Sequence, residues 1–193
     1  MKHALLLSIP TLLVCLSASA QAVKPVSIAN DKAVTISVSF SKAGEVYLKG
    51  SFVPKARTYK TPAGVFGKEG KLEMERSQGC VWTYTTNPLP SELYTYNFEL
   101  NEVDTFDVSN PNQVRNINTI YNYFIITDGI ADDYVDADVP HGKVGYVWYQ
   151  SSLPDLPRRR MAIYTPPQYS SGGSYPVLYL LHGSGGDETS WPR

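Results

Sequence analysis

The chain has few of the residues that catalysis and metal binding most often use. Its 193 residues include only three histidines and two cysteines. His3 lies in an N-terminal segment that we expect to be removed, so His141 and His182 are the histidines of the mature chain. Cys80 is then the only cysteine left, and no disulfide within the mature chain is required. We interpret Cys80 as a small buried apolar residue.

Runs of basic charge are also scarce. The formal net charge is −1, and Arg158–Arg160 is the only basic run. This run lies directly before a predicted strand, so we interpret it as the solvated entrance of that strand. Without a polybasic tract, we do not expect nucleic acid as a partner.

Residues 1–22 have the pattern of a secretory signal peptide. Lys2 provides a basic start, residues 4–16 are predominantly apolar, and the small residues at 18–20 offer a cleavage site near Ala20, with Ala22 as a neighbouring option. The apolar stretch is too short for a membrane span. We therefore expect a secreted or periplasmic protein with no membrane span.

Residues 23–127 show the pattern of an all-β domain. Residues 34–40 and 94–100 alternate apolar and polar side chains, as half-buried strands do. Further strand candidates, separated by turn clusters, are residues 45–52, 71–75, 81–86 and 120–127. Several short strands without a convincing amphipathic helix predict a β-sandwich.

Motifs in this region resemble a known family. The segments Val46–Phe52, Gly79–Tyr84 and Pro88–Phe98 resemble the early-set immunoglobulin-like domain that precedes many carbohydrate esterases. They are also similar to family-48 carbohydrate-binding modules and glycogen-binding domains. The family's Asp-Pro-x-Asn loop is replaced by Asp107–Asn112, which departs from the pattern. The resemblance implies a polysaccharide partner.

Aromatic side chains are the usual platforms for a pyranose ring, and the domain has several. We consider Trp82 and Tyr84 as carbohydrate-binding residues, although a tryptophan on a strand is more often part of the core, and we favour the core for Trp82. The other candidates are Tyr47, Tyr59, Tyr121 and Tyr123. From the sequence, sugar binding and bracing of a second domain remain alternatives.

Residues 128–142 lack the alternation of apolar and polar residues that marks the preceding strands. They are also rich in aspartate, and together these features predict an acidic linker. A calcium loop is the alternative, but the spacing lacks the glycine and glutamate of an EF-hand. We therefore expect no metal and no cofactor. His141 precedes a predicted strand at residues 143–151, and we interpret it as structural.

The C-terminal part has a different pattern. Val177–Leu181 is continuously apolar, which is typical of a strand covered on both faces of a parallel sheet. A glycine-rich loop, His182–Gly186, follows it and fits an oxyanion hole. An ordinary glycine-rich turn is the alternative. A phosphate-binding loop is disfavoured because neither Gly-Lys-Ser/Thr nor GxGxxG is present.

The segments Arg158–Tyr169 and Tyr175–Trp191 resemble the opening of the family-1 carbohydrate esterases, which include feruloyl and acetyl xylan esterases and are related to esterase D. The resemblance implies that residues 143–193 are the N-terminal portion of an α/β-hydrolase domain. It places Gly183 in the oxyanion loop and assigns the oxyanion amide to Ser184. Glu188 and Trp191 would lie near the mouth of the site, where they support the loop or touch substrate.

A serine esterase also needs a nucleophile elbow and a catalytic histidine. The sequence has no Gly-x-Ser-x-Gly, and neither His141 nor His182 is free for this role. We therefore expect this chain alone to be inactive. Our first hypothesis is a truncated N-terminal fragment of a secreted serine carboxylesterase acting on acylated plant polysaccharide or oligosaccharide. The alternative is a non-catalytic carbohydrate-binding β-sandwich with a vestigial esterase tail.

Overall fold

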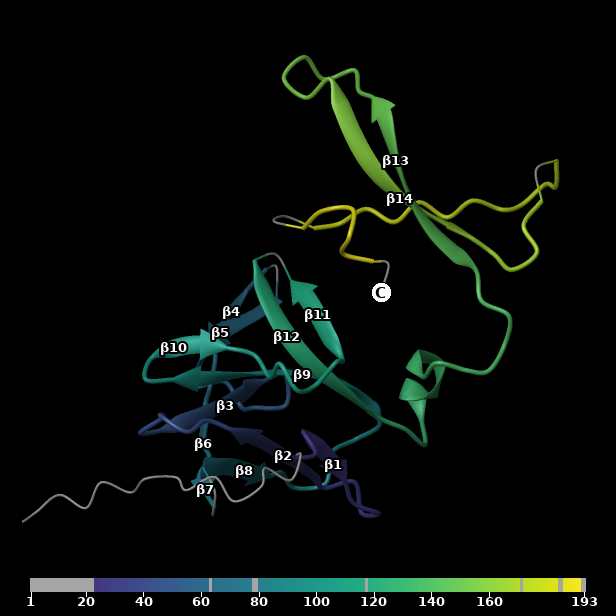
Figure 1. Cartoon of the computed structure of the whole chain (residues 1–193). Coiled ribbons are helices and arrows are strands. Elements are labelled where there is room, and N and C mark those ends of the chain that lie inside the picture. Colours follow the sequence, from purple (N-terminus) through teal and green to yellow (C-terminus); the bar gives the residue numbers. More distant parts are fainter. Residues whose placement is uncertain are drawn as a thin grey trace, which may run out of the picture.

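The computed structural model describes residues 23–62, 64–77, 80–116, 118–170, 172–183 and 186–191. Strands dominate these residues, and a 3-10 helix, η2 (Ile130–Tyr134), follows the last strand of the first domain (Figure 1). The strands are β1 (Val26–Ile28), β2 (Val34–Ser39), β3 (Val46–Gly50), β4 (Arg57–Thr61), β5 (Gly64–Lys68), β6 (Leu72–Glu73), β7 (Glu75–Arg76), β8 (Val81–Thr85), β9 (Glu92–Leu100), β10 (Val103–Thr105), β11 (Gln113–Asn116), β12 (Thr119–Ile126), β13 (Lys143–Gln150) and β14 (Arg158–Thr165).

Two antiparallel sheets form the first domain. The smaller sheet has the order β1-β2-β8-β7, and the larger has the order β11-β12-β9-β3-β6, with β10 also paired to β9. The register places Ile36 opposite Tyr84 in the smaller sheet and Leu48 opposite Phe98 in the larger sheet. The strands predicted at residues 34–40, 45–52, 81–86, 94–100 and 120–127 are confirmed to within two residues at each end. The stretch predicted at 71–75 contains the short strand β6 and the first residue of β7.

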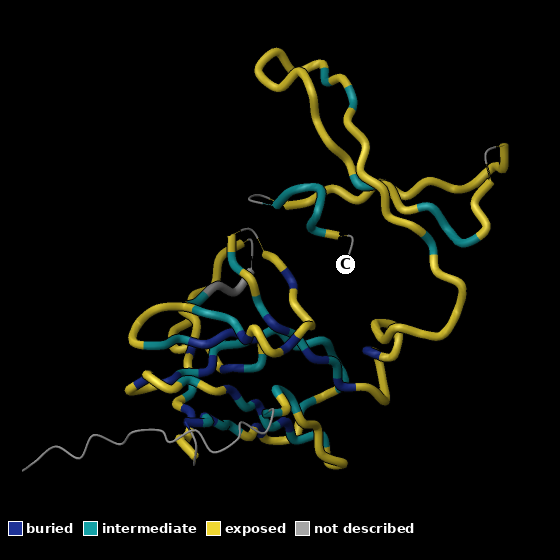
Figure 2. Tube along the Cα trace, in the orientation of Figure 1, coloured by how far each residue is buried: buried dark blue, intermediate teal, exposed yellow. Residues whose placement is uncertain are grey.

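The inner faces of the two sheets meet in one hydrophobic core. On β2 the buried positions alternate, with Val34, Ile36 and Val38 facing inward. The larger sheet contributes Tyr96 and Phe98 from β9, whose rings lie edge to face with centroids 5.6 Å apart. Buried positions gather inside this domain in Figure 2. The structure therefore confirms the predicted β-sandwich, and each large buried side chain stabilises it by about 1.5–3 kcal/mol.

A buried polar network ties the loop after β10 to this core. Asn122 is completely buried, and its amide donates hydrogen bonds to the carbonyls of Asp107 (2.9 Å) and Asn110 (3.1 Å). Its carbonyl accepts one from the Asp107 amide at 2.6 Å. The Asn110 side chain donates in turn to the Tyr96 hydroxyl at 2.9 Å. The loop that departs from the family pattern is thus held by side-chain hydrogen bonds.

The predicted linker begins with ordered structure. Within η2, Ala131 is fully buried and its amide donates a hydrogen bond to the Ser91 hydroxyl at 3.1 Å, so this turn packs on the sandwich. Beyond it, β13 and β14 pair only with each other among the described residues. Arg158–Arg160 lie within β14, with Arg160 opposite Trp148, rather than before the strand as we predicted. The arginines gain contact with aromatic rings on β13 in this position.

The strand predicted at Val177–Leu181 is not formed. These residues have no strand assignment, and Val177 and Leu181 are 71% and 85% exposed. The physical reason is that no strand of the described residues lies beside them to complete a hydrogen-bonded ladder. The part of the chain that the structure describes therefore contains no parallel α/β-hydrolase sheet, and the fold shown is all-β.

We expect the substitution Asn122→Ala to lower the free energy of unfolding by about 2–3 kcal/mol, because it leaves the buried Asp107 and Asn110 backbone groups without partners. Urea unfolding followed by tryptophan fluorescence measures this change. Ser37→Ala, on the outer face of the smaller sheet, is the matched control and should stay within about 0.5 kcal/mol of wild type. Equal stability of the two variants would contradict a structural role for the network.

Candidate functional site

The two aromatic residues proposed from the sequence as sugar platforms lie in or against the core. Trp82 is 5% exposed, and its indole N–H donates to the Phe40 carbonyl at 3.2 Å. Tyr84 is half-buried and packs against the same core. The Trp82 ring has almost no surface in contact with solvent, whereas Tyr84 keeps part of its surface exposed. The burial of Trp82 agrees with the core role that we favoured for it, and sugar binding by the half-buried Tyr84 stays a prediction.

The outer face of the larger sheet carries a different set of side chains. Alternation along β3 turns Tyr47 and Lys49 outward, and the register places them opposite Glu99 and Asn97 of β9. On β12, Tyr121 and Tyr123 are half-buried between the inward-facing Asn122, Phe124 and Ile126. Three of the tyrosines that the sequence analysis named thus share one face of the sheet. We call this surface, over β3, β9, β10 and β12, the outer-face site.

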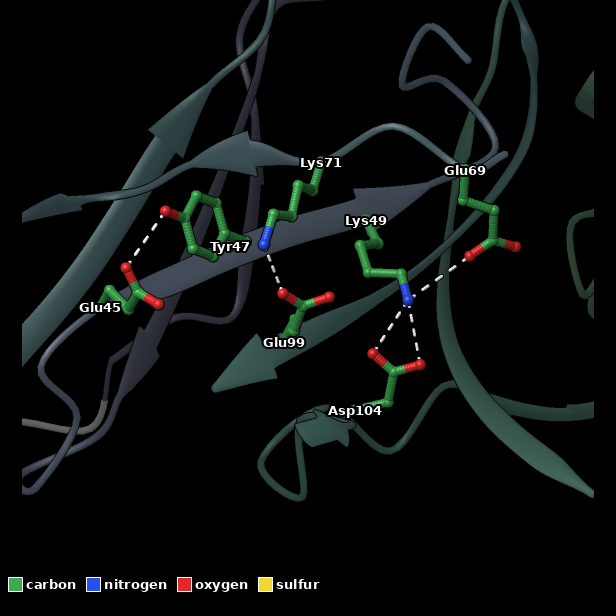
Figure 3. A network of polar contacts seen from close by, with 7 residues as sticks. All are labelled: Glu45, Tyr47, Lys49, Glu69, Lys71, Glu99 and Asp104. Atoms are coloured by element: carbon green, nitrogen blue, oxygen red, sulfur yellow. Dashed lines mark hydrogen bonds and ion pairs between the residues drawn. The ribbon is translucent and has the colours of Figure 1, made fainter. Parts of the chain in front are cut away.

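Carboxylates hold Lys49 firmly in this site. Its ammonium group lies 2.9 Å from the Asp104 carboxylate of β10 and 3.5 Å from that of Glu69, just beyond β5 (Figure 3). The side chain is only 14% exposed. Burial alone would lower the pKa of Lys49, but the hydrogen bonds and charges of Asp104 and Glu69 outweigh burial and raise the pKa above its ordinary value. Lys49 is therefore charged at neutral pH.

A second lysine lies beside the first (Figure 3). The Lys71 ammonium donates to the Glu99 carboxylate at 2.5 Å, and it lies 3.9 Å from the centroid of the Tyr47 ring. The Glu99 hydrogen bond raises the pKa of Lys71 above its ordinary value. Tyr47 donates its own hydroxyl to Glu45 at 3.1 Å, and that bond raises the Tyr47 pKa. The site therefore holds two cations, four carboxylates and neutral tyrosine hydroxyls.

One buried amide in the site has an unused acceptor. Asn97 is 2% exposed, lies opposite Lys49, and its side-chain oxygen has no hydrogen-bond partner among the described residues. A buried acceptor without a partner costs free energy unless something bonds to it. Donors and acceptors held beside ring faces suit a polyhydroxylated ligand. The sequence analysis named Tyr47 and Tyr121 but missed the lysines and carboxylates of the site. The only sign of these charged residues in the sequence is that they occupy polar positions of strands whose side chains alternate.

The glycine-rich loop is partly described. Ser184, proposed as the oxyanion amide, lies outside the described residues. Gly183 is exposed, and its carbonyl accepts a hydrogen bond from the Gly186 amide at 3.1 Å. Glu188 forms an ion pair with Arg160, which fits support of the loop, and Trp191 is 54% exposed. No nucleophile with an adjacent general base is present among these described loop residues.

The segment that follows this loop is a turn held by side-chain hydrogen bonds. The Asp187 carboxylate accepts bonds from the Thr189 amide (2.9 Å) and the Thr189 hydroxyl (2.5 Å), while the Ser190 hydroxyl accepts one from the Asp187 amide (3.1 Å). A bond from an amide to an aspartate side chain two residues earlier is typical of an Asx-turn. The Thr189 bonds, together with the charges of Arg115 and His182, hold the pKa of Asp187 below its ordinary value. Arg115 belongs to the sandwich and lies 3.9 Å from this carboxylate.

Among the residues described above, no three His, Cys, Asp or Glu side chains come close enough to hold a metal ion. The Asp132 carboxylate, one of the candidates weighed for calcium, accepts hydrogen bonds from the Asp128 and Gly129 amides at the start of η2. No helix in the described ranges has the length and apolar character needed to cross a bilayer.

No protein-family model matches the chain. Among solved structures, the pullulanase of Anoxybacillus sp. LM18-11 in complex with maltotetraose is similar at 22% identity and a TM-score of 0.32, over 53% of this chain and 13% of that one. The apo pullulanase of Paenibacillus barengoltzii is similar at 18% identity and a TM-score of 0.36, over 60% of this chain and 16% of that one. The matched part is thus a small fraction of these enzymes. At such TM-scores the fold description rests on the strand pairing and the core given above.

We expect Thr189→Val to raise the pKa of the Asp187 carboxyl group, because the substitution removes the hydroxyl bond that favours the ionised form. Because the native pKa is lowered, the Thr189 bonds stabilise the turn above the unfolded pKa and are lost as the pH falls through the native value. Carbon-detected NMR of the carboxyl resonance against pH measures the midpoint. Ser190→Ala, which leaves the carboxylate bonds intact, is the control. An unchanged midpoint in Thr189→Val would contradict the assignment.

Proposed function

We propose that the β-sandwich, residues 23–127, is a non-catalytic carbohydrate-binding module whose ligand lies on the outer-face site. The observation that carries the proposal is the combination of Tyr47 and Tyr121 with Lys49 and Lys71, each lysine held in place by carboxylates on neighbouring strands. The family resemblance of Val46–Phe52 supports the same conclusion. A polysaccharide is the proposed ligand class.

The chemistry of the site matches that ligand. Sugar hydroxyls both donate and accept hydrogen bonds, so carboxylates and ammonium groups that are already positioned bond to them without first ordering flexible side chains. Tyrosine rings pack on the apolar face of a pyranose while their hydroxyls stay in water. Binding of this kind requires no bond breaking in the ligand.

Affinity electrophoresis of the full chain through gels with and without polysaccharide tests this proposal. We expect xylan or starch to retard the wild-type protein, and we expect Tyr121→Ala to restore most of the mobility because it removes a ring from the outer-face site. Thr83→Ala, on the outer face of the smaller sheet, is the control and should migrate as wild type does. Unchanged mobility of the wild-type protein in every polysaccharide tried would overturn the proposal.

We also propose a second role, in which residues 143–193 form the first part of an esterase domain braced by the sandwich. Apolar side chains exposed on both faces of the β13–β14 hairpin, among them Trp148 and Met161, favour it because an isolated hairpin is marginally stable.

Sequencing the gene beyond Arg193 tests this second role. An open reading frame that encodes Gly-x-Ser-x-Gly and a later histidine supports the esterase, in which the Ser184 amide would help to hold the oxyanion. An authentic stop codon directly after Arg193 would contradict it and leave the carbohydrate-binding module with a vestigial tail.

A further inference from the structure

The β4–β5 hairpin concentrates positive charge on an otherwise slightly acidic protein. Residues 55–68 contain no aspartate or glutamate, whereas the chain as a whole has a net charge of −1. The basic residues of this stretch are Lys55, Arg57, Lys60 and Lys68, and all are exposed. Sequence analysis did not single out this stretch because its basic residues are not consecutive.

Three of these charges are uncompensated. Arg57, Lys60 and Lys68 form no ion pair with any of the residues that the structure describes. The register sets Arg57 directly opposite Lys68, so two cations face each other on the same side of the hairpin. Like charges at directly opposed positions destabilise a strand pair. The nearest acidic residue in sequence, Glu69, bonds instead to Lys49 at 3.5 Å.

The base of the hairpin is held beside the outer-face site. The Ala56 amide donates to the Lys68 carbonyl at 3.1 Å. At Gly70 a Cβ atom would lie 1.9 Å from the Pro54 carbonyl oxygen, so only glycine allows the two chains to approach this closely. The Lys49–Glu69 ion pair then joins the base to β3. A chain-like ligand on the outer-face site therefore has the basic hairpin as its neighbour.

An aromatic ring completes the surface. Tyr59 lies on the same side of the hairpin as Arg57 and Lys68, two residues along β4, and is 60% exposed. A guanidinium group binds a carboxylate through two parallel hydrogen bonds, and an opposed ammonium group adds a third donor. The Tyr59 ring, beside these guanidinium and ammonium groups, offers a packing surface for the sugar that bears the carboxylate.

We propose that the β4–β5 hairpin binds the carboxylates of uronic-acid units, so that the ligand of this protein is an acidic polysaccharide. This assignment rests on the proposed function and narrows it to one class of glycan. Isolated carboxylates spaced along a neutral backbone match the two uncompensated cations on this side of the hairpin, Arg57 and Lys68, better than the dense phosphates of nucleic acid do, since no polybasic tract continues the positive charge elsewhere in the sequence.

Isothermal titration calorimetry of the full chain tests this assignment with two ligands, a xylan that carries glucuronic acid and the same xylan after chemical reduction of its carboxyl groups. We expect the acidic xylan to bind about tenfold more tightly, the effect of one to two charge-assisted contacts. The double variant Arg57→Gln/Lys68→Gln should bind both xylans equally, at the affinity of the reduced form. Lys24→Gln/Lys42→Gln, which removes two exposed lysines elsewhere, should keep the preference.

The outcomes separate the two proposals. Equal binding of both xylans by the wild-type protein would overturn the role of the hairpin and leave the carbohydrate-binding proposal intact. Binding of neither xylan, nor of any other polysaccharide, would overturn both. Binding of single-stranded DNA as tight as that of the acidic xylan would replace the assignment with a general polyanion surface. Circular dichroism of each variant checks that the sandwich remains folded.

Discussion

The register of β9 is the constraint on which the sandwich and its outer face both depend. This strand pairs with β3 along one edge and with β12 and β10 along the other. Its even-numbered residues Tyr96 and Phe98 fill the core, while Asn97 and Glu99 face outward. Because side chains alternate strictly, a shift of one residue would bury the polar set and expose the aromatic set.

The buried Asn122 network fixes that register at one end. Asn122 lies directly opposite Tyr96 across β12 and β9, and its hydrogen bonds reach Asp107 and Asn110 in the loop that leads to β11. Buried polar groups tolerate little displacement, since each lost partner costs free energy. The same strands that close the core therefore hold Lys49, Glu99 and Asp104 at fixed separations on the outer face.

Local pattern was enough to predict the core strands β2, β3, β8, β9 and β12, because the side chains of a half-buried strand alternate every two residues and this needs no distant information. The outer-face site was not predictable in the same way. Lys49 meets Asp104 across 55 residues of sequence, and such a pair depends on the strand order rather than on spacing. The apolar run Val177–Leu181 was predicted as a strand and is not one, since a strand exists only where a neighbour completes its hydrogen bonds.

An NMR titration of the isotopically labelled full chain with xylo-oligosaccharides, including ones that carry glucuronic acid, tests most directly whether the outer face binds sugar. The account predicts progressive shifts of the amide resonances of Tyr47, Asn97 and Tyr121, with those of Thr35 and Thr83 on the opposite sheet unchanged. Shifts confined to the smaller sheet or to the C-terminal hairpin, or no shifts at millimolar sugar, would contradict the account.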